Sequence, residues 1–563
     1  MIFVYVYAII SVYIDAGGIN LSNFEKLLVN IPDDKGIHTK SAGAKREKYV
    51  YKYIQYYRNK EGKPRNKAKA IGKYDSISGK MFPNSNYFTI YNLDPMLPDV
   101  SVWDYGYSYL VLKACHDMNL WECLATVFPS NALDIVIMSA FMIREGNAMD
   151  GLDDWQQRNY FKGSGRMLTS QVTSRIFGTI TEKQRNEFFK LWVNTASSDG
   201  SIFYDVTSFS SYAQEMTAVE RGYNRDGEDL PQYNLGMFCE ERNKTPLYYN
   251  RYNGSLTDRT NLSYVLANAK SVGINRVKMV LDGGFWSQEC FTSLHTCCEA
   301  FIIGMPTFLK EAEKIIAEYG TGIELYANEL PLRNIYCIPV NHEIFGIAGR
   351  VLLYYDSYSH VNQCAELSAT IDRLNAELAD LKRYPKNNIR RYDHYFILTK
   401  HEQDNGFDYV IDNDKVEKLR KAKGYFLIFS TEIQSSPADI LSLYRAKDAD
   451  EKLFSQIKVD MDGGRIRTHN ETTTDGKTFV TFVACVIRSY ILGKLNDYLT
   501  TNSTSLKKVF NQLSNISIIS NSNNNEYRFS KALTKKQKKI LTVFEANDSI
   551  ISSLKQRVST LKK

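Results

Sequence analysis

Two aspartates stand where predicted β-strands could bring carboxylates together. Asp205 lies within the predicted strand 201–209, and Asp282 ends the predicted strand 276–282. If these strands are neighbours, the carboxylates face each other at one edge of a sheet, where α/β folds place their sites. Two close carboxylates are costly unless a cation joins them, and their oxygens suit Mg²⁺ or Mn²⁺. The pair therefore predicts a site for divalent cations.

A third carboxylate, Glu451, falls in a helix predicted over roughly 437–459. Tyr444, Lys447, Glu451 and Lys458 follow one another at intervals of 3, 4 and 7 residues. At about 100° per residue, these side chains would share one narrow stripe of the helix. Glu451 could then bind a metal while its neighbours bind phosphates. An ordinary salt-bridged surface helix is the alternative, and the spacing alone favours that alternative.

The predicted elements would position the two aspartates on one mixed sheet. Three strands come first, and a short turn between the second and third indicates a hairpin, so these strands are expected to be antiparallel. Each later strand follows a helical crossover and is expected to be parallel to its neighbour. The predicted ranges are strands 201–209, 232–240 and 245–253, helix 258–272, and strands 276–282 and 299–305.

Residues 306–430 interrupt this pattern with short strands and one clear helix, 361–383. In that helix, leucines and one isoleucine repeat at 4-3-4-3 spacing from Leu367 to Leu381. Two heptads are too few for a secure coiled coil, so local packing is expected. A further helix is predicted at 477–495, and the basic run 535–539 is interpreted as a solvated helix face.

The region 100–198 has helical periodicity, with apolar residues at steps of three and four. Residues 166–193 predict two short helices joined by a turn, and Thr181 could cap the second one. Bundle packing is the favoured interpretation of these two helices. A helix-turn-helix that reads DNA is the alternative.

A basic hairpin is predicted near the amino terminus. Residues 40–73 contain twelve Lys or Arg and two Glu, a net charge of +10, whereas the whole chain carries +7. Two alternating stretches within 48–73 flank the turn-like 59–62, and tyrosines alternate with the basic residues. Such a ribbon suits a nucleic-acid backbone, although a solvated charged hairpin would have the same pattern. The predicted DNA-binding patch comprises Lys45, Arg46, Lys48, Lys52, Arg58, Lys60, Lys63, Arg65, Lys67 and Lys69.

Composition excludes several classes of protein. With 44% hydrophobic and 24% charged residues, the chain of 563 residues is neither disordered nor collagen-like, and its length suggests three or four domains. Nine irregularly spaced cysteines favour reduced thiols and a cytoplasmic location. The apolar residues 1–14 are too few to span a membrane, and no other stretch is predicted to do so.

Three local features receive structural interpretations. The cluster of Cys290, His295, Cys297 and Cys298 has no second pair of zinc-like ligands, so a half-buried helix is expected. The acidic run 226–229 is interpreted as a loop before the second strand of the sheet. Trp286 could stack on a base, but a place in the core is at least as well supported.

Three motifs, taken together and in order, resemble insertion-sequence transposases of the DDE type. The residues YDVTSF around Asp205 resemble the first acidic motif of that family, and Asp282-Gly283-Gly284-Phe285 matches its second, D-x-G-F/W. The third motif, Y-x2-R-x3-E-x6-K, is matched from Tyr444 to Lys458, with Lys447 in place of Arg. The resemblance is to the group with this Tyr-Arg-Glu-Lys signature and runs from about residue 47 to 495.

This resemblance implies a ribonuclease H-like core, a mixed α/β sheet flanked by helices and interrupted by a β-rich insertion. The domains would be an amino-terminal segment 1–99, a mainly helical region 100–198 for DNA binding or dimer support, a core in two parts (199–305 and 431–497), an insertion 306–430 and a helical tail 498–563. Asp205, Asp282 and Glu451 would hold two Mg²⁺ ions, or Mn²⁺ in substitution, and Tyr444, Lys447 and Lys458 would position phosphates. Lys447 offers a point charge where Arg offers a bidentate fork.

The activity implied by the resemblance is cutting and joining the ends of the protein's own insertion sequence. The partners would be double-stranded DNA, both the terminal inverted repeats and the target, and a second copy of the chain in a homodimer, without a membrane. A nuclease of the same fold, or a DNA-binding protein without catalysis, remains an alternative.

Overall fold

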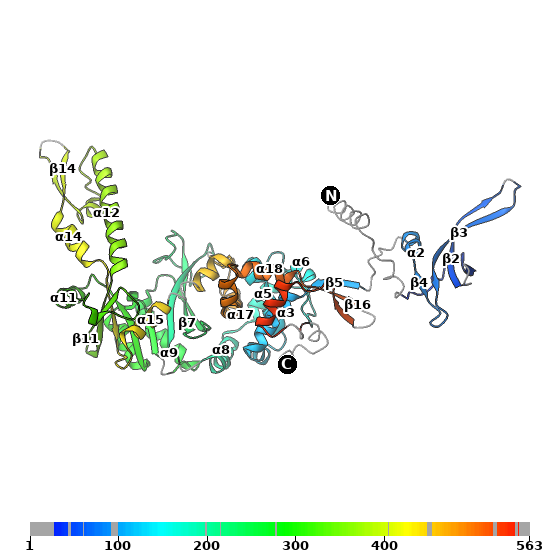
Figure 1. Cartoon of the computed structure of the whole chain (residues 1–563), viewed down its shortest axis with the longest axis horizontal. Coiled ribbons are helices and arrows are strands. Elements are labelled where there is room, and N and C mark those ends of the chain that lie inside the picture. Colours follow the sequence, from blue (N-terminus) through cyan, green and yellow to red (C-terminus); the bar gives the residue numbers. More distant parts are fainter. Residues whose placement is uncertain are drawn as a thin grey trace. The chain divides into compact units, whose positions relative to one another are not determined.

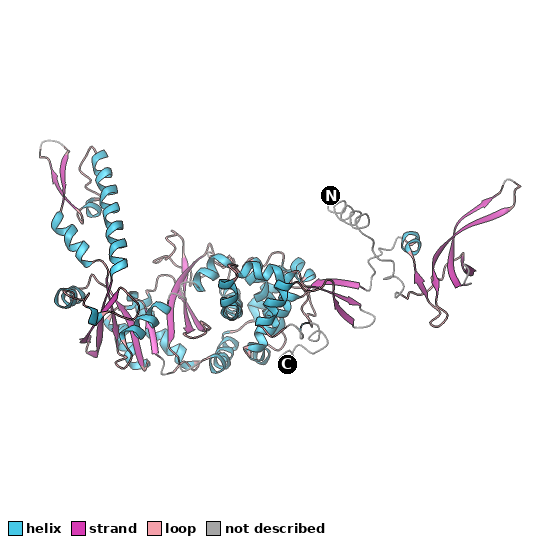
Figure 2. Ribbon diagram, in the orientation of Figure 1, coloured by secondary structure: helices cyan, strands magenta, loops and turns pink. Residues whose placement is uncertain are grey.

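The computed structural model describes residues 28–42, 47–59, 61–91, 100–197, 200–213, 216–275, 278–402, 405–447, 453–521, 526–546 and 550. The chain divides into two compact units, residues 1–102 with 519–528, and residues 103–518 with 529–563. The predicted apolar segment 1–14 lies outside the described residues. Figures 1 and 2 show a mixed α/β protein.

The first unit contains a four-stranded antiparallel sheet of order β1-β2-β3-β4. Its long β2–β3 ribbon confirms the predicted hairpin (Figure 1). The turn is held by Asn59, whose Oδ1 accepts hydrogen bonds from the backbone N–H of Glu61 and Lys63 at 3.1 and 2.8 Å. Val50, Ile71 and Met81 form its core. The elements are β1 (Ile37–Ala42), β2 (Glu47–Arg58), β3 (Pro64–Tyr74), β4 (Met81–Pro83) and α2 (Ser85–Ile90).

The predicted helical region is confirmed in the second unit. A capping box at Thr181 begins α8, because its hydroxyl accepts from the backbone N–H of Gln184, whose side chain accepts from the N–H of Thr181. The helices are α3 (Gly106–Asp117), α4 (Leu120–Val127), α5 (Ala132–Glu145), α6 (Leu152–Arg158), α7 (Ser170–Thr179) and α8 (Glu182–Ala196).

The long helix α17 (Glu471–Thr501) forms the core of this helical region. It packs against α3, α5 and α7, and extends beyond the predicted range 477–495 at both ends. By length and composition alone α17 could cross a membrane, contrary to expectation, but 67% of its most apolar window is buried inside the protein. Packing within the protein therefore accounts for its apolar character. The elements that follow are α18 (Leu506–Ser514) and α19 (Lys535–Val543), and strands β5 (Val100–Asp104), β16 (Ser517–Asn521) and β17 (Glu526–Phe529) form a small sheet.

The main sheet has eight strands in the order β11-β12-β15-β10-β9-β6-β7-β8. Strands β6, β7 and β8 are antiparallel neighbours, whereas β9 pairs in parallel with both β6 and β10. The strands predicted from the sequence are therefore confirmed in place and direction. The elements are β6 (Ile202–Ser210), β7 (Gln232–Glu240), β8 (Pro246–Asn253), α9 (Asp258–Ser271), β9 (Lys278–Leu281), η2 (Gly283–Phe285), α10 (Gln288–Cys297) and β10 (Ala300–Met305).

The sheet continues into the region predicted to interrupt it. Strand β15 pairs antiparallel with β10, β12 pairs with β15, and β11 pairs with β12. Three strands of the segment 306–430 thus extend the main sheet. The bounds are α11 (Lys310–Tyr319), η3 (Tyr326–Asn328), β11 (Ile335–Ile344), β12 (Ile347–Asp356) and β15 (Tyr425–Ser430).

The rest of that segment is a small helical and β subdomain (Figure 1). Helix α12 buries Leu367, Ile371, Leu374 and Leu378 against aromatic residues such as Phe396, which confirms local packing. The bounds are α12 (Ser357–Asp380), α13 (Ile389–Tyr392), β13 (Phe396–Lys400), β14 (Phe407–Ile411) and α14 (Asn413–Ala422).

The prediction of a single helix over 437–459 was wrong. Helix α15 (Pro437–Ala446) ends before Lys447, and a π-helical turn, η4 (Gln456–Asp460), forms further on. Residues 448–452 lie outside the described part of the chain. Because a π-helical turn closes i→i+5 hydrogen bonds, a stripe calculated at 100° per residue does not extend through Lys458.

Candidate functional site

The register of β6 and β9 brings the two predicted aspartates side by side. Ile202 pairs with Met279, and Phe203 pairs with Val280. The same register, continued for two residues, places Asp205 opposite Asp282, which directly follows β9. Both side chains are half-buried. Two carboxylates on adjacent parallel strands thus share one level of the sheet.

Helix α15 covers the face of the sheet to which these carboxylates belong. Ile440 and Leu441 of α15 pack in one cluster with Phe203 and Val280. Side chains two residues apart on a strand point to the same face, so Asp205 shares the face of Phe203. The helix that begins the predicted third motif is therefore anchored beside the carboxylates.

Tyr444 reaches the same place through a gap left by a glycine. A Cβ atom on Gly304 would clash with the hydroxyl of Tyr444. The same Cβ position is 3.2 Å from the backbone N of Gly283, the residue after Asp282. A side chain at Gly304 would thus displace Tyr444. Glycine at this position of β10 allows a tyrosine hydroxyl to approach the loop after Asp282.

Lys447, directly after α15, is buried although it carries a charge. Its exposed fraction is 4%, and the residues that follow it, 448–452, lie outside the described part of the chain. Burying a lysine is costly unless its ammonium group reaches water or an anion. Lys447 therefore stays a predicted phosphate-binding residue.

Lys458, the last residue of the third motif, is held by an acidic loop. Its Nζ is 2.6 Å from Asp226 Oδ2 and 5.8 Å from the centre of the Phe209 ring. In the same loop Glu228 pairs with Arg465 at 3.1 Å. The run 226–229 lies before β7 as predicted, but it also pairs with basic residues near η4, which the sequence analysis did not foresee.

Arg225 lies close to Asp205 and was missed by the sequence analysis. Its guanidinium donates to Ser208 Oγ at 3.0 Å and is ion-paired with Asp258. Burial opposes its charge, but the negative charge of Asp258, with a smaller effect of Asp205, outweighs burial and raises the pKa of Arg225. Tyr252 donates a hydrogen bond of 2.5 Å to Asp258. Only the folding of the β6–β7 loop over the start of α9 brings these residues together.

The loop after Asp282 is fixed from two sides. Asp282 caps η2 by accepting from the backbone N–H of Gly284. Arg259, in the first turn of α9, donates through Nε to the carbonyl oxygen of Gly284 at 2.7 Å. Trp286, just beyond, is 8% exposed and packs on Phe291 with ring centres 4.9 Å apart, so it belongs to the core.

The described residues contain two of the three predicted metal ligands. Glu451 lies outside them, and no group of three His, Cys, Asp or Glu that could hold a metal occurs among the described side chains. The cysteines near His295 belong to α10 and its end and are free thiols, as expected. Asp205 and Asp282 supply hard oxygen donors at one level of the sheet, and this donor set fits Mg²⁺ or Mn²⁺.

The basic ribbon β2–β3 displays most of the predicted DNA-binding patch. Lys45, Arg46 and Lys60 fall outside the described residues, and Lys52 is half-buried in an ion pair of 2.9 Å with Asp34. The exposed members are Lys48, Arg58, Lys63, Arg65, Lys67 and Lys69. Six basic side chains therefore remain on a protruding ribbon with exposed Tyr56 and Tyr57.

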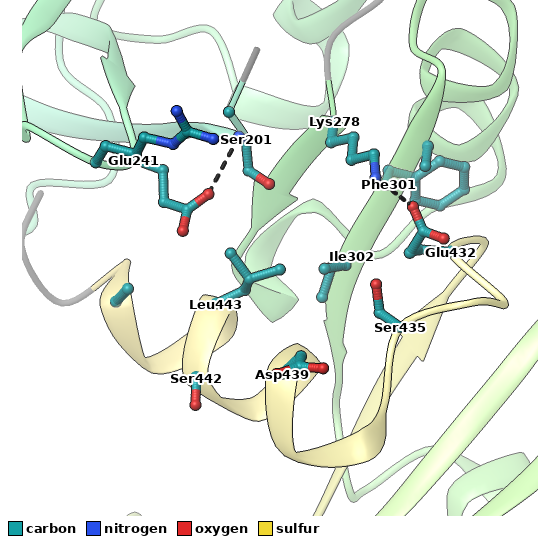
Figure 3. Close-up of a pocket in the computed structure, with 14 residues that line it drawn as sticks. Ser201, Glu241, Lys278, Phe301, Ile302, Glu432, Ser435, Asp439, Ser442 and Leu443 are labelled. Carbon is teal, nitrogen blue, oxygen red and sulfur yellow. Dashed lines mark hydrogen bonds and ion pairs between the residues drawn. The ribbon is translucent and has the colours of Figure 1, made fainter. Parts of the chain in front are cut away.

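A cavity of about 560 Å³ lies at the opposite ends of the strands (Figure 3). Ser201, Lys278 and Ala300, at the beginnings of β6, β9 and β10, line it, as does α15. Lys278 pairs with Glu432 at 2.7 Å across it. Asp282 follows the other end of β9, so this cavity is separate from the carboxylate pair.

Comparisons with known proteins give a distant structural similarity. No protein-family model matches the chain, and neither does any curated protein. Among solved structures, the chain is similar to a piggyBac transposase determined by cryo-electron microscopy as a synaptic complex with hairpin DNA. The two chains are 9% identical, the similarity covers 77% of this chain and 75% of the other, and the TM-score is 0.32. A similarity at this level carries no argument, so function must be argued from the residues of this chain.

Proposed function

We propose that this protein is a DNA transposase of the DDE type that cuts and joins the ends of its own insertion sequence. The observation that carries the proposal is the parallel pairing of β6 with β9, whose register, continued for two residues, puts Asp205 level with Asp282. Glu451 is proposed as the third carboxylate. These three residues are the acidic positions of the motifs on which the sequence resemblance is based.

The order of strands supports a ribonuclease H-like core. In chain order, β6, β7 and β8 form an antiparallel meander, and β9 then β10 add in parallel on the other side of β6. The helices α9 and α10 provide the two crossovers. That is the arrangement expected for the core that the motifs imply.

The proposed carboxylates would bind two divalent cations, Mg²⁺ or Mn²⁺. Such ions, when bound, activate a nucleophilic oxygen and neutralise charge at the leaving oxygen of an in-line phosphoryl transfer. The protein would hold the two carboxylates in place, because Asp205 lies within β6 and Asp282 caps η2. Arg225 beside Asp205 limits the repulsion between the carboxylates before cations bind.

Three side chains would position the DNA. Lys447, a largely buried lysine, would bind a phosphate, and the hydroxyl of Tyr444 can donate to an oxygen close to the Asp282 loop. Lys458 would exchange Asp226 for a phosphate when DNA binds. The exposed ribbon β2–β3 would add contacts to the DNA backbone, and a homodimer in the cytoplasm would pair two element ends.

Cleavage of DNA that carries the flanks of the gene tests the proposal. We expect wild type to cut at the flank boundary with Mg²⁺ and to join the released ends to a second duplex. Asp282→Asn should reduce cutting at least about 100-fold and should retain DNA binding. Mutation of a residue that only hydrogen-bonds to a metal ligand already lowers activity by up to about 100-fold, so loss of a ligand should lower it at least as much. Asp372→Asn, on the exposed side of α12, is the matched control and should cut normally.

The products separate the alternatives. Cutting without joining would favour a nuclease of the same fold. Binding of the flanks without cutting, with either Mg²⁺ or Mn²⁺, would contradict the catalytic proposal and leave a DNA-binding protein.

A further inference from the structure

A second polar cavity lies between the amino-terminal turns of α7 and α17. Its volume is about 320 Å³, and Ser170, Thr173 and Ser174 of α7 face Asn470, Thr473 and Lys477 across it. Thr169 caps α7, and Asn470 caps α17. The first N–H groups of a helix carry a partial positive charge and lack partners within the helix. Residues from the first turns of two helices, 10 and 31 residues long, thus line one cavity, which extends along α7 as far as Phe177.

Lys477 lines this cavity with a buried ammonium group. It is 3% exposed, and no described residue forms a hydrogen bond or an ion pair with its ammonium group. Helix α17 approaches α7 so closely at the neighbouring Gly476 that the backbone of Phe177 leaves no room for a side chain there. A charge buried without a partner is costly, so Lys477 either loses its proton or finds an anion.

We propose that this cavity binds a tetrahedral oxyanion of the phosphate class. Lys477 supplies a positive charge to the cavity, and the first turns of the two helices add partial positive charge. The hydroxyls of Ser170, Ser174 and Thr473 are further donors. The anion is either a phosphate of the DNA backbone or a free phosphate, and the site does not depend on the carboxylate pair.

The other charged groups around the cavity are Arg467, His469 and Asp150. Arg467 pairs with Asp462 at 2.7 Å, and His469 is exposed at the rim. Asp150, also exposed, opposes an anion. Asp475, on the neighbouring turn of α17, is paired with Arg185 and Arg251 instead. Burial, and then the charge of Arg467, lower the pKa of Lys477 to about 7.

Sulfate is the probe of choice, because it remains a dianion from pH 6 to 8. Isothermal titration calorimetry on the full chain should show sulfate binding that weakens about tenfold between pH 6 and pH 8, as Lys477 loses its proton. Lys477→Met should bind sulfate at least about tenfold more weakly and lose the pH dependence. His469→Gln should keep that dependence, and Asp150→Asn should bind more tightly.

These outcomes decide the proposal. Equal sulfate binding by wild type and Lys477→Met, or a pH dependence that His469→Gln removes, would overturn it. If Lys477→Met fails to fold, the exposed variant Asp150→Asn replaces it. An affinity for sulfate unchanged in Asp150→Asn, together with a flat pH profile of sulfate binding by wild type, would overturn the proposal. A short DNA duplex distinguishes the sources, because Lys477→Met weakens its binding only if the anion is a backbone phosphate. Cleavage by the Asp282 site is not part of these readouts, so the two proposals fail separately.

Discussion

The side chain of Lys458 lies between an aromatic ring and a carboxylate. If Lys458 binds a DNA phosphate, Asp226 competes for the same ammonium group. We expect Asp226→Asn to strengthen DNA binding by up to about fivefold, because exposed or half-exposed ion pairs contribute up to about 1 kcal/mol. Fluorescence anisotropy with a labelled duplex measures this change.

Asp229→Asn is the matched control for that prediction. Asp229 lies in the same loop but pairs with Arg221 at the surface, so the same loss of charge leaves Lys458 paired. A similar gain in affinity for both variants would show that net charge, not the release of Lys458, is responsible.

At the scale of elements, α15 is positioned on β10 by a glycine. Gly304→Ala would place a methyl group on the hydroxyl of Tyr444. We expect it to lower the free energy of unfolding by about 1–3 kcal/mol, as overpacking does. Urea denaturation measures the change, and Tyr444→Phe in the same chain should recover part of the loss because it removes the clashing oxygen.

Gly178→Ala in α7 is the control for that substitution. A Cβ at Gly178 meets no atom within 4 Å. This variant should be neutral or more stable by up to about 1 kcal/mol, because alanine favours helix. Equal destabilisation by the two variants would contradict the role assigned to Tyr444.

The cap of α8 gives a second prediction for an element. Thr181→Ala removes the side-chain acceptor of the capping box and should cost about 1 kcal/mol of unfolding free energy. Thr181→Ser keeps the hydroxyl and should cost less. Thermal denaturation of both variants checks the order.

At the scale of the whole molecule, the surplus positive charge is concentrated on one ribbon. Replacing Lys63, Arg65, Lys67 and Lys69 by Ala should weaken binding to any duplex. The slope of log affinity against log salt concentration should become shallower by about 0.9 for each DNA phosphate that the ribbon no longer neutralises. Unchanged affinity and salt dependence would show that the ribbon is only a solvated surface. The proposed metal-binding residues should keep their affinity for Mn²⁺ in this variant.

Much of the main sheet is predictable from the sequence, because β6, β7 and β10 are buried, apolar and bounded by turns. Whether the strands of Asp205 and Asp282 are neighbours was a condition of the sequence analysis, and the pairing of β6 with β9 meets it. The ion pair of Lys458 with Asp226 is not predictable, since it joins residues more than 200 positions apart through a loop.

Two further features escape prediction for physical reasons. The sheet extends through β12 and β15 because their backbone groups pair with strands distant in the chain, which local periodicity does not report. The end of α15 at Ala446 and the π-helical turn at Gln456–Asp460 also escape prediction, because a 3.6-residue pattern does not distinguish a π-helical turn from an α-helix. Glu451 lies outside the described residues, so its place on a stripe with Lys458 stays a prediction.

The binding of Mn²⁺ to the full chain with element-end DNA tests the central claim most directly. Electron paramagnetic resonance of free Mn²⁺ counts the ions bound. We predict two ions per chain in wild type, and fewer in Asp205→Asn and in Asp282→Asn, because both carboxylates would hold the same pair of ions. Asp372→Asn should match wild type. Full Mn²⁺ binding by Asp282→Asn would contradict the account.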